Sequence, residues 1–205
     1  MFNLKTRPPA IALLAFLAAA PGLPQADVVW EDDESWVRIE GAEKGAPPND
    51  HPADLTAADV QTLLGGLEVR RRKGEAPVPL FSLEELELIT PYLATAFAEA
   101  GPGQDVYFRT RGGHSQSAFI GRKLFVTQGL MFMSEGRLNV IFNRLQEEAR
   151  KRNFYGQRDE DFYSARPPSR KRETEFRNIS LMQGDGAVLR LEGGSVRGDW
   201  VEIAA

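Results

Sequence analysis

The hydrophobic pattern changes its period at Asp105, and this change limits the possible folds more than any other feature of the sequence. From Asp105 onward, short runs alternate apolar and polar residues between glycine-containing turns: DVYFRTR, SAFIGRKLFVTQ, LMFMSEG and RLNVIF. A period of two is typical of strands that bury one face, and short glycine turns join antiparallel neighbours. The sequence therefore predicts an antiparallel meander in this region.

The segment before Asp105 has the period of a helix. Ser82 and Glu85 have the spacing of a capping box, and Gly101 followed by proline gives a stop signal. We expect this helix to kink or restart at Pro91, because proline lacks the backbone N–H of a helix interior. Its core-facing residues are predicted to be Leu86, Ile89, Leu93 and Phe97.

Four further elements are predicted from local signals. Thr56 and Asp59 indicate a helix start, and Gly65 and Gly66 indicate its end. Strands are expected at 35–40 and 67–72, and a charged helix at 143–152 is expected to continue from a strand at 137–142. The last element is a hairpin that turns near Gly193 and Gly194. The fold class is therefore α+β, with two or three helices packed on an antiparallel β-meander and a C-terminal hairpin.

The first 26 residues have the order of a secretory signal peptide. Lys5 and Arg7 form a basic start, an apolar run covers 11–20, and the small-residue stretch PGLPQA leads to Ala26. The apolar run is too short for a bilayer core, which needs about 20 residues. We therefore expect cleavage after Ala26 and no stable membrane anchor afterwards; a retained anchor is the alternative. The expected location is periplasmic or secreted.

The remaining chain, 27–205, is long enough for a single α+β domain. It has no cysteine, so no disulfide can hold the fold together and a packed core must do so. The formal net charge of −4 becomes −6 when Lys5 and Arg7 are removed with the leader. A nucleic-acid partner is not expected, because binding to phosphates needs a basic surface.

Charge is unevenly distributed along the chain. Residues 27–59 carry ten acids, whereas residues 144–172 carry nine bases against five acids. The two regions are expected to attract each other within the fold; the alternative is that one of them faces a charged partner.

An irregular surface segment is expected at about 154–176, because it shows neither helical nor strand periodicity. Loops of this length are usually functional or disordered. Its mixture of aromatic and arginine side chains suits a protein partner, and a solvated connection is the alternative. The candidate partner-binding residues are Tyr155, Arg158, Phe162, Tyr163, Arg166 and Arg170.

The nearest approach to a catalytic motif is GGHSQS at 112–117. His114 and Ser115 begin like a nucleophile elbow, but Ser117 replaces the final glycine and the context is β-like rather than strand–turn–helix. His114 and Ser115 are therefore weak catalytic candidates, and whether the protein is an enzyme stays open, with the balance against it. No cofactor is expected. No metal site is expected either, since the chain has only two histidines and no calcium-loop spacing.

Two stretches carry a resemblance. PPNDHPADLTAADVQTLLGGLEVR and PVPLFSLEELELITPYLATAFAEAGPGQDVYFRTRG, together with the leader, are similar to a group of uncharacterised exported bacterial proteins. The resemblance covers about a third of the chain. It implies an envelope location and no particular chemistry.

Three functions remain open from sequence. The first is an exported accessory or binding protein of the bacterial envelope that acts through protein contacts. The second is a periplasmic hydrolase of an envelope polymer that uses His114 and Ser115, or a pair of carboxylates. The third is a small-ligand carrier. The sequence does not predict the oligomeric state.

We expect the exported protein to begin near Asp27, because the basic start and short apolar run are those of a cleaved leader. Intact-mass measurement of the protein from the periplasmic fraction checks this. A chain that retains residues 1–26 and partitions into membranes would contradict it.

Overall fold

The computed structural model describes residues 26–32, 34–115, 122–149, 166–184 and 186–205. In these ranges the chain is mostly antiparallel β-sheet with two α-helices, which confirms the mixed α+β class. The predicted leader lies almost entirely outside the described residues.

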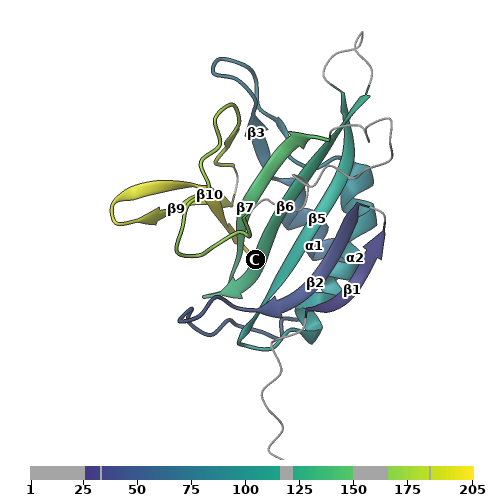
Figure 1. Ribbon diagram of the computed structural model, residues 1–205, viewed down its shortest axis with the longest axis vertical. Helices are drawn as coiled ribbons and strands as arrows, with labels where there is room; N and C mark the ends of the chain where they lie inside the picture. Colours follow the sequence, from purple (N-terminus) through teal and green to yellow (C-terminus); the bar gives the residue numbers. More distant parts are fainter. Residues whose placement is uncertain (1–25, 33, 116–121, 150–165, 185) are drawn as a thin grey trace, which may run out of the picture.

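A seven-stranded antiparallel sheet forms the body of the protein (Figure 1). Strands β5, β6 and β7 pair in chain order at its centre, and β10 adds to β7. In spatial order its strands are β1 (Asp27–Asp32), β2 (Ser35–Gly41), β5 (Gln104–Ser115), β6 (Arg122–Ser134), β7 (Arg137–Glu148), β10 (Ser195–Ala204) and β9 (Ala187–Glu192). A three-stranded sheet consists of β4 (Val78–Pro79), β3 (Glu68–Arg70) and β8 (Ser180–Leu181).

Both helices, α1 (Ala57–Gly65) and α2 (Leu83–Glu99), pack against one face of the large sheet (Figure 1). The capping box predicted at Ser82 with Glu85 is present, and the helix start predicted at Thr56 is also a capping box, closed by Asp59. α2 runs as one helix through Pro91, so the chain does not restart there.

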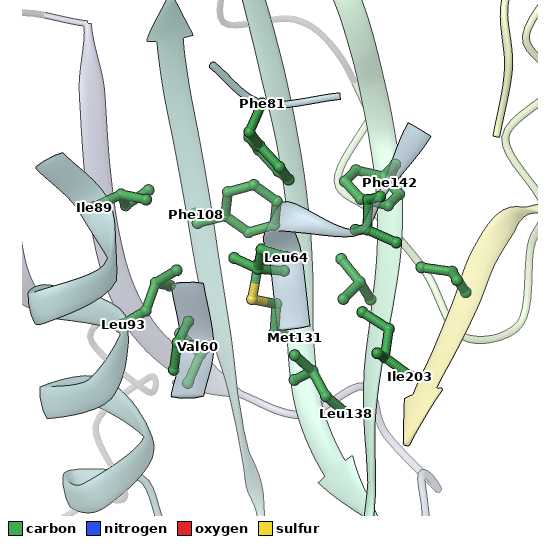
Figure 2. Packing of buried hydrophobic residues seen from close by; sticks show 14 of the residues in the cluster. Val60, Leu64, Phe81, Ile89, Leu93, Phe108, Met131, Leu138, Phe142 and Ile203 are labelled. Atoms are coloured by element: carbon green, nitrogen blue, oxygen red, sulfur yellow. The ribbon is translucent and has the colours of Figure 1, made fainter. Parts of the chain in front are cut away.

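The main core lies between the helices and the sheet (Figure 2). All four residues predicted to face the core from α2 are buried. Phe108 of β5 lies between Phe81 and Phe142, with ring centroids 6.2 and 6.1 Å away. A smaller cluster on the opposite face of the sheet contains Leu130, Phe132, Ile141 and Trp200.

The helix predicted at 143–152 is wrong over its described part, because β7 continues as a strand to Glu148. β7 is central and its residues from Leu138 to Phe142 are all buried, so its sequence does not alternate. Register shifts opposite Gln128 add to the irregularity. A buried strand of this kind carries apolar residues at spacings that also fit a helix.

Two of the glycine-containing segments that were predicted to be turns, at 112–113 and at 129, also lie in strands. Gly112 and Gly113 lie within β5, and β6 passes through Gly129 without a break. A side chain at Gly129 would place its Cβ 2.5 Å from the carbonyl oxygen of Ile141. This glycine therefore permits close packing rather than a turn.

Leu93→Ala is expected to lower the free energy of unfolding by about 2–5 kcal/mol, because this fully buried side chain fills the interface between α2 and the sheet. Leu88→Ala on the exposed side of α2 is the control and should cost less than about 0.5 kcal/mol. Urea unfolding of both variants checks this; equal losses would show that α2 does not bury the predicted face.

Candidate functional site

A buried polar cluster lies where the start of α2 meets β5. Glu85, at the third position of α2, is 3 % exposed. Its Oε2 accepts a hydrogen bond from the backbone N–H of Ser82 at 2.8 Å, and its Oε1 accepts one from Thr110 Oγ1 at 2.9 Å. The same Oε2 lies 2.9 Å from His114 Nε2. One carboxylate therefore both caps the helix and contacts two residues of the strand below it.

Gln146 of β7 closes the other side of this cluster. Its Nε2 donates to the carbonyl oxygens of Pro79 and Leu80 at 2.9 and 2.7 Å, and its Oε1 accepts from Arg71 Nε and Nη2 at 3.1 and 2.9 Å. These four contacts determine which end of the amide is nitrogen. The nitrogen end lies 3.4 Å from His114 Nδ1. Both hydrogens of this amide nitrogen already point to the carbonyl oxygens of Pro79 and Leu80, so its contact with the imidazole is the weakest of the set.

This arrangement leaves the imidazole of His114 little freedom to act on a substrate. Nε2 faces Glu85 and Nδ1 faces Gln146. Nε2 lies 2.9 Å from the carboxylate but without the alignment of a good hydrogen bond. The ring is buried and packs edge-on against Phe125, with 5.8 Å between centroids. Ser115 ends β5, opposite Arg122 in the strand register, and its side chain is outside the described part of the structure.

Gly112 makes room for the carboxylate. A Cβ at this position would lie 2.0 Å from Cδ of Glu85. Real Cβ atoms do not approach other atoms so closely, so any side chain at this position of β5 would displace the Glu85 carboxylate from its contacts. Gly112 and His114 of the motif that resembled a nucleophile elbow are thus part of the packing between α2 and the sheet.

The pKa of Glu85 lies below its ordinary value. Burial raises it, but the contacts with His114 and with Ser82 lower it by more. The ionised carboxylate is therefore the form that the folded chain stabilises.

A second buried polar cluster lies at the other end of β5. Asp105 is fully buried, and its Oδ1 accepts hydrogen bonds from Asn49 Nδ2 at 2.8 Å and from Arg170 Nη2. The Arg170 guanidinium lies over the ring of Phe132, 3.5 Å from its centroid. Burial raises the pKa of Asp105, while Arg170 and Asn49 oppose that rise.

Residues 169–174 are held against the sheet by groups from three regions. Glu43 accepts hydrogen bonds from Ser169 Oγ and from the backbone N–H of Arg170, both at 3.0 Å. Arg197 donates to the carbonyl oxygens of Ser169, Arg170 and Arg172 at 3.0, 2.7 and 3.1 Å. Glu43 thus links the acidic stretch to the basic one through a hydroxyl and a backbone N–H, and the charge attraction expected between the two stretches stays a prediction.

Arg197 and Asp199 are themselves buried and form an ion pair at 3.0 Å. Asp199 also accepts a hydrogen bond from the backbone N–H of Thr174 at 2.8 Å. The tripeptide Arg197-Gly198-Asp199 has the sequence of a cell-attachment motif, but both of its charged side chains are buried within the fold.

The predicted partner-binding residues fall into two groups. Tyr155, Arg158, Phe162 and Tyr163 lie outside the described residues. Arg166 is exposed, and its carbonyl oxygen accepts from Asn143 Nδ2 at 2.8 Å. Arg170 was predicted to lie in a surface segment, but here it is buried together with Pro168 and Ser169. Its side chain is committed to Asp105, Asn49 and Phe132 within the chain.

Across the described ranges, no group of three or more His, Asp or Glu side chains is placed to hold a metal ion. None of the helices in these ranges is long and apolar enough to cross a membrane.

The hairpin formed by β9 and β10 exposes apolar side chains. Leu191 and Val196, opposite each other in the strand register, are 65 % and 50 % exposed, and Val188 is 43 % exposed. In Figure 1 this yellow hairpin projects from the side of the sheet opposite β1. The hairpin is predicted by the sequence, but the exposure of these apolar side chains is not. The sequence AVLRLE contained the signal. It has apolar residues at both odd and even positions, which face opposite sides of the sheet, although an edge strand buries less of its surface than a central one.

Glu85→Gln is expected to lower stability at neutral pH by about 1–3 kcal/mol, because the amide is a weaker partner for the buried groups around it. It should also flatten the pH dependence. The folded-state pKa of Glu85 is depressed, so its stabilisation is present above its ordinary value of 4.5 and is lost as the pH falls below it. Urea unfolding of the wild type and the variant between pH 7 and pH 3 checks both effects. Parallel stability curves for the two proteins would contradict the assignment.

Comparison with protein-family models, with curated proteins and with solved structures gives no match to this chain. The arguments for its function therefore come from its own contacts and surfaces.

Proposed function

We propose that this protein is an exported accessory or binding protein of the bacterial envelope that acts through protein contacts. The observation that carries the proposal is the exposed apolar hairpin face, formed by Leu191 and Val196. Single exposed apolar residues are normal at protein surfaces, but adjacent ones on a projecting element mark contact sites.

The charge pattern near this face supports the same reading. Arg190 pairs with Glu202, and Arg197 pairs with Glu192 at 3.4 Å. The ionic groups of the hairpin are thus paired within the hairpin itself. Little free charge then surrounds the apolar hairpin face, and its burial by a partner has a small desolvation cost.

The buried polar clusters weigh against the hydrolase alternative. The imidazole of His114 has both ring nitrogens against protein groups, and a general base needs one of them within reach of a substrate proton. The Glu85–His114 pair is better explained as a joint between α2 and β5. Export rests on the leader sequence and is part of the proposal.

The double variant Leu191→Ser/Val196→Ser is expected to reduce the recovery of crosslinked partners from a bacterial envelope extract at least several-fold, because the partner would lose its apolar contacts. Crosslinking followed by affinity recovery and mass spectrometry measures this. Val28→Ser is the control, since Val28 is 54 % exposed on the opposite edge strand β1. Recovery of the same partners by the double variant would exclude this face as the contact surface.

A further inference from the structure

Strand β9 has backbone hydrogen-bonding groups that no other described segment of the chain uses. Among the described residues its neighbour in the sheet is β10 alone. The turn at Gly193 and Gly194, with φ of 58° and 85°, joins Glu192 to its register partner Ser195. In a hairpin with a two-residue turn the closing pair is hydrogen-bonded and the next pair is not. The N–H and C=O groups of Leu191 therefore point away from β10.

The other end of β9 gives the same assignment. The backbone N–H of Ala204 donates to Gly186, so alternate residues from Gly186 onward face β10 and the residues between them face outward. Ala187 faces outward but exchanges two hydrogen bonds with Gly184, at 3.1 and 3.2 Å. The open part of the edge is thus short and consists of the backbone groups of Leu189 and Leu191.

The two edges of the sheet differ in their protection. β1, at the far edge, carries Asp27, Glu31 and Asp32, and charges on an edge strand discourage pairing with other chains. On both edges charged side chains pair with the neighbouring strand, as Glu31 does with Arg38 and Arg190 with Glu202. β9 carries one base and one acid, Arg190 and Glu192, whereas β1 carries three acids, so β9 has less net charge to repel an added strand.

The register of β9 argues against pairing with a second copy of itself. Two copies in one continuous antiparallel sheet must place a residue opposite itself, since paired residues share a face. Leu189 and Leu191 each have one outward N–H and one outward C=O. All four groups of each copy are paired only when Leu189 of one copy lies opposite Leu191 of the other. That register puts Arg190 directly opposite Arg190, and like charges in this position are destabilising.

The side chains of β9 indicate which residues a strand bound to it would need. Leu189 packs against the main core, and Leu191 shares its face of the sheet. Arg190 points to the opposite face, where Glu202 binds its Nη1 while 46 % of its side chain is exposed. An added strand therefore gains most from apolar residues opposite both leucines and an acidic residue opposite Arg190.

We propose that β9 binds an extended, antiparallel segment of another protein with the pattern apolar–acidic–apolar. The main-chain bonds to Leu189 and Leu191 supply binding, and Arg190 selects the acidic residue and rejects a second copy. This proposal rests on the proposed function and identifies the chemistry of the partner.

The test uses synthetic peptides and the full chain without its leader. The probe is acetyl-TTLELTT-amide, followed by amide chemical shifts in an NMR titration. We expect shifts centred on Leu189 and Leu191. The peptide TTLKLTT should bind about tenfold more weakly, because an attractive cross-strand pair becomes a repulsive one. The TTLELTT peptide with N-methylated leucines should not bind, since it cannot donate to the β9 carbonyls.

Three protein variants complete the test. Leu191→Pro removes an outward N–H that β10 does not use, so the hairpin should fold but lose peptide binding; Leu191→Thr keeps that N–H and should retain most of it. The swap Arg190→Glu/Glu202→Arg keeps an ion pair within the hairpin and should reverse the order of the two peptides. Thermal unfolding verifies that each variant is folded.

Three results would overturn the proposal: binding of the N-methylated peptide, equal binding of the two charged peptides, or self-association of the wild type through β9 in sedimentation. Crosslinking of Leu191→Pro separates this proposal from the proposed function. If that variant keeps the partners that Leu191→Ser/Val196→Ser loses, the apolar contact stands and strand addition fails.

Discussion

The placement of α2 over the sheet depends on one buried carboxylate. Glu85 closes the capping box at the start of α2 and contacts Thr110 and His114 of β5. Because the same group determines where the helix begins and where it meets the sheet, the helix cannot slide along β5 without exposing an unpaired charge to the core. Gly112 makes this joint possible by leaving the space that the carboxylate occupies.

The parts of the fold that sequence could predict are those determined over a few residues. The capping boxes at Thr56 and Ser82 and the turn at Gly193 need only neighbouring positions, and the buried face of α2 follows from its period. The pairing of Asp105 with Arg170 joins residues 65 positions apart, and neither residue has a local feature that distinguishes it from a solvated charge. The same holds for His114, whose partners come from α2 and β7.

β7 shows a different limit. Its central position buries both faces, so Asn139, Arg144 and Gln146 are enclosed in the strand beside Leu138 and Ile141. Polar residues that lie inside because they have partners there break the alternation by which strands are recognised. The candidate contact surface at β9 has the opposite character. Its apolar residues were visible in the sequence, but their exposure follows from the place of β9 at the edge of the sheet, and strand order is a property of the whole chain.

Arg197 links the final strand to a segment made well before it. Its guanidinium holds the carbonyl groups of residues 169, 170 and 172, and Asp199 holds Thr174. During synthesis these residues emerge before β10, so their available partners at that stage are Glu43, Asn49 and Asp105. The bonds to the three carbonyl groups can form only after β10 has been made. A chain that ends before Arg197 would keep the contacts of this segment with Glu43, Asn49 and Asp105, but its carbonyl groups and the N–H of Thr174 would lose their partners on β10.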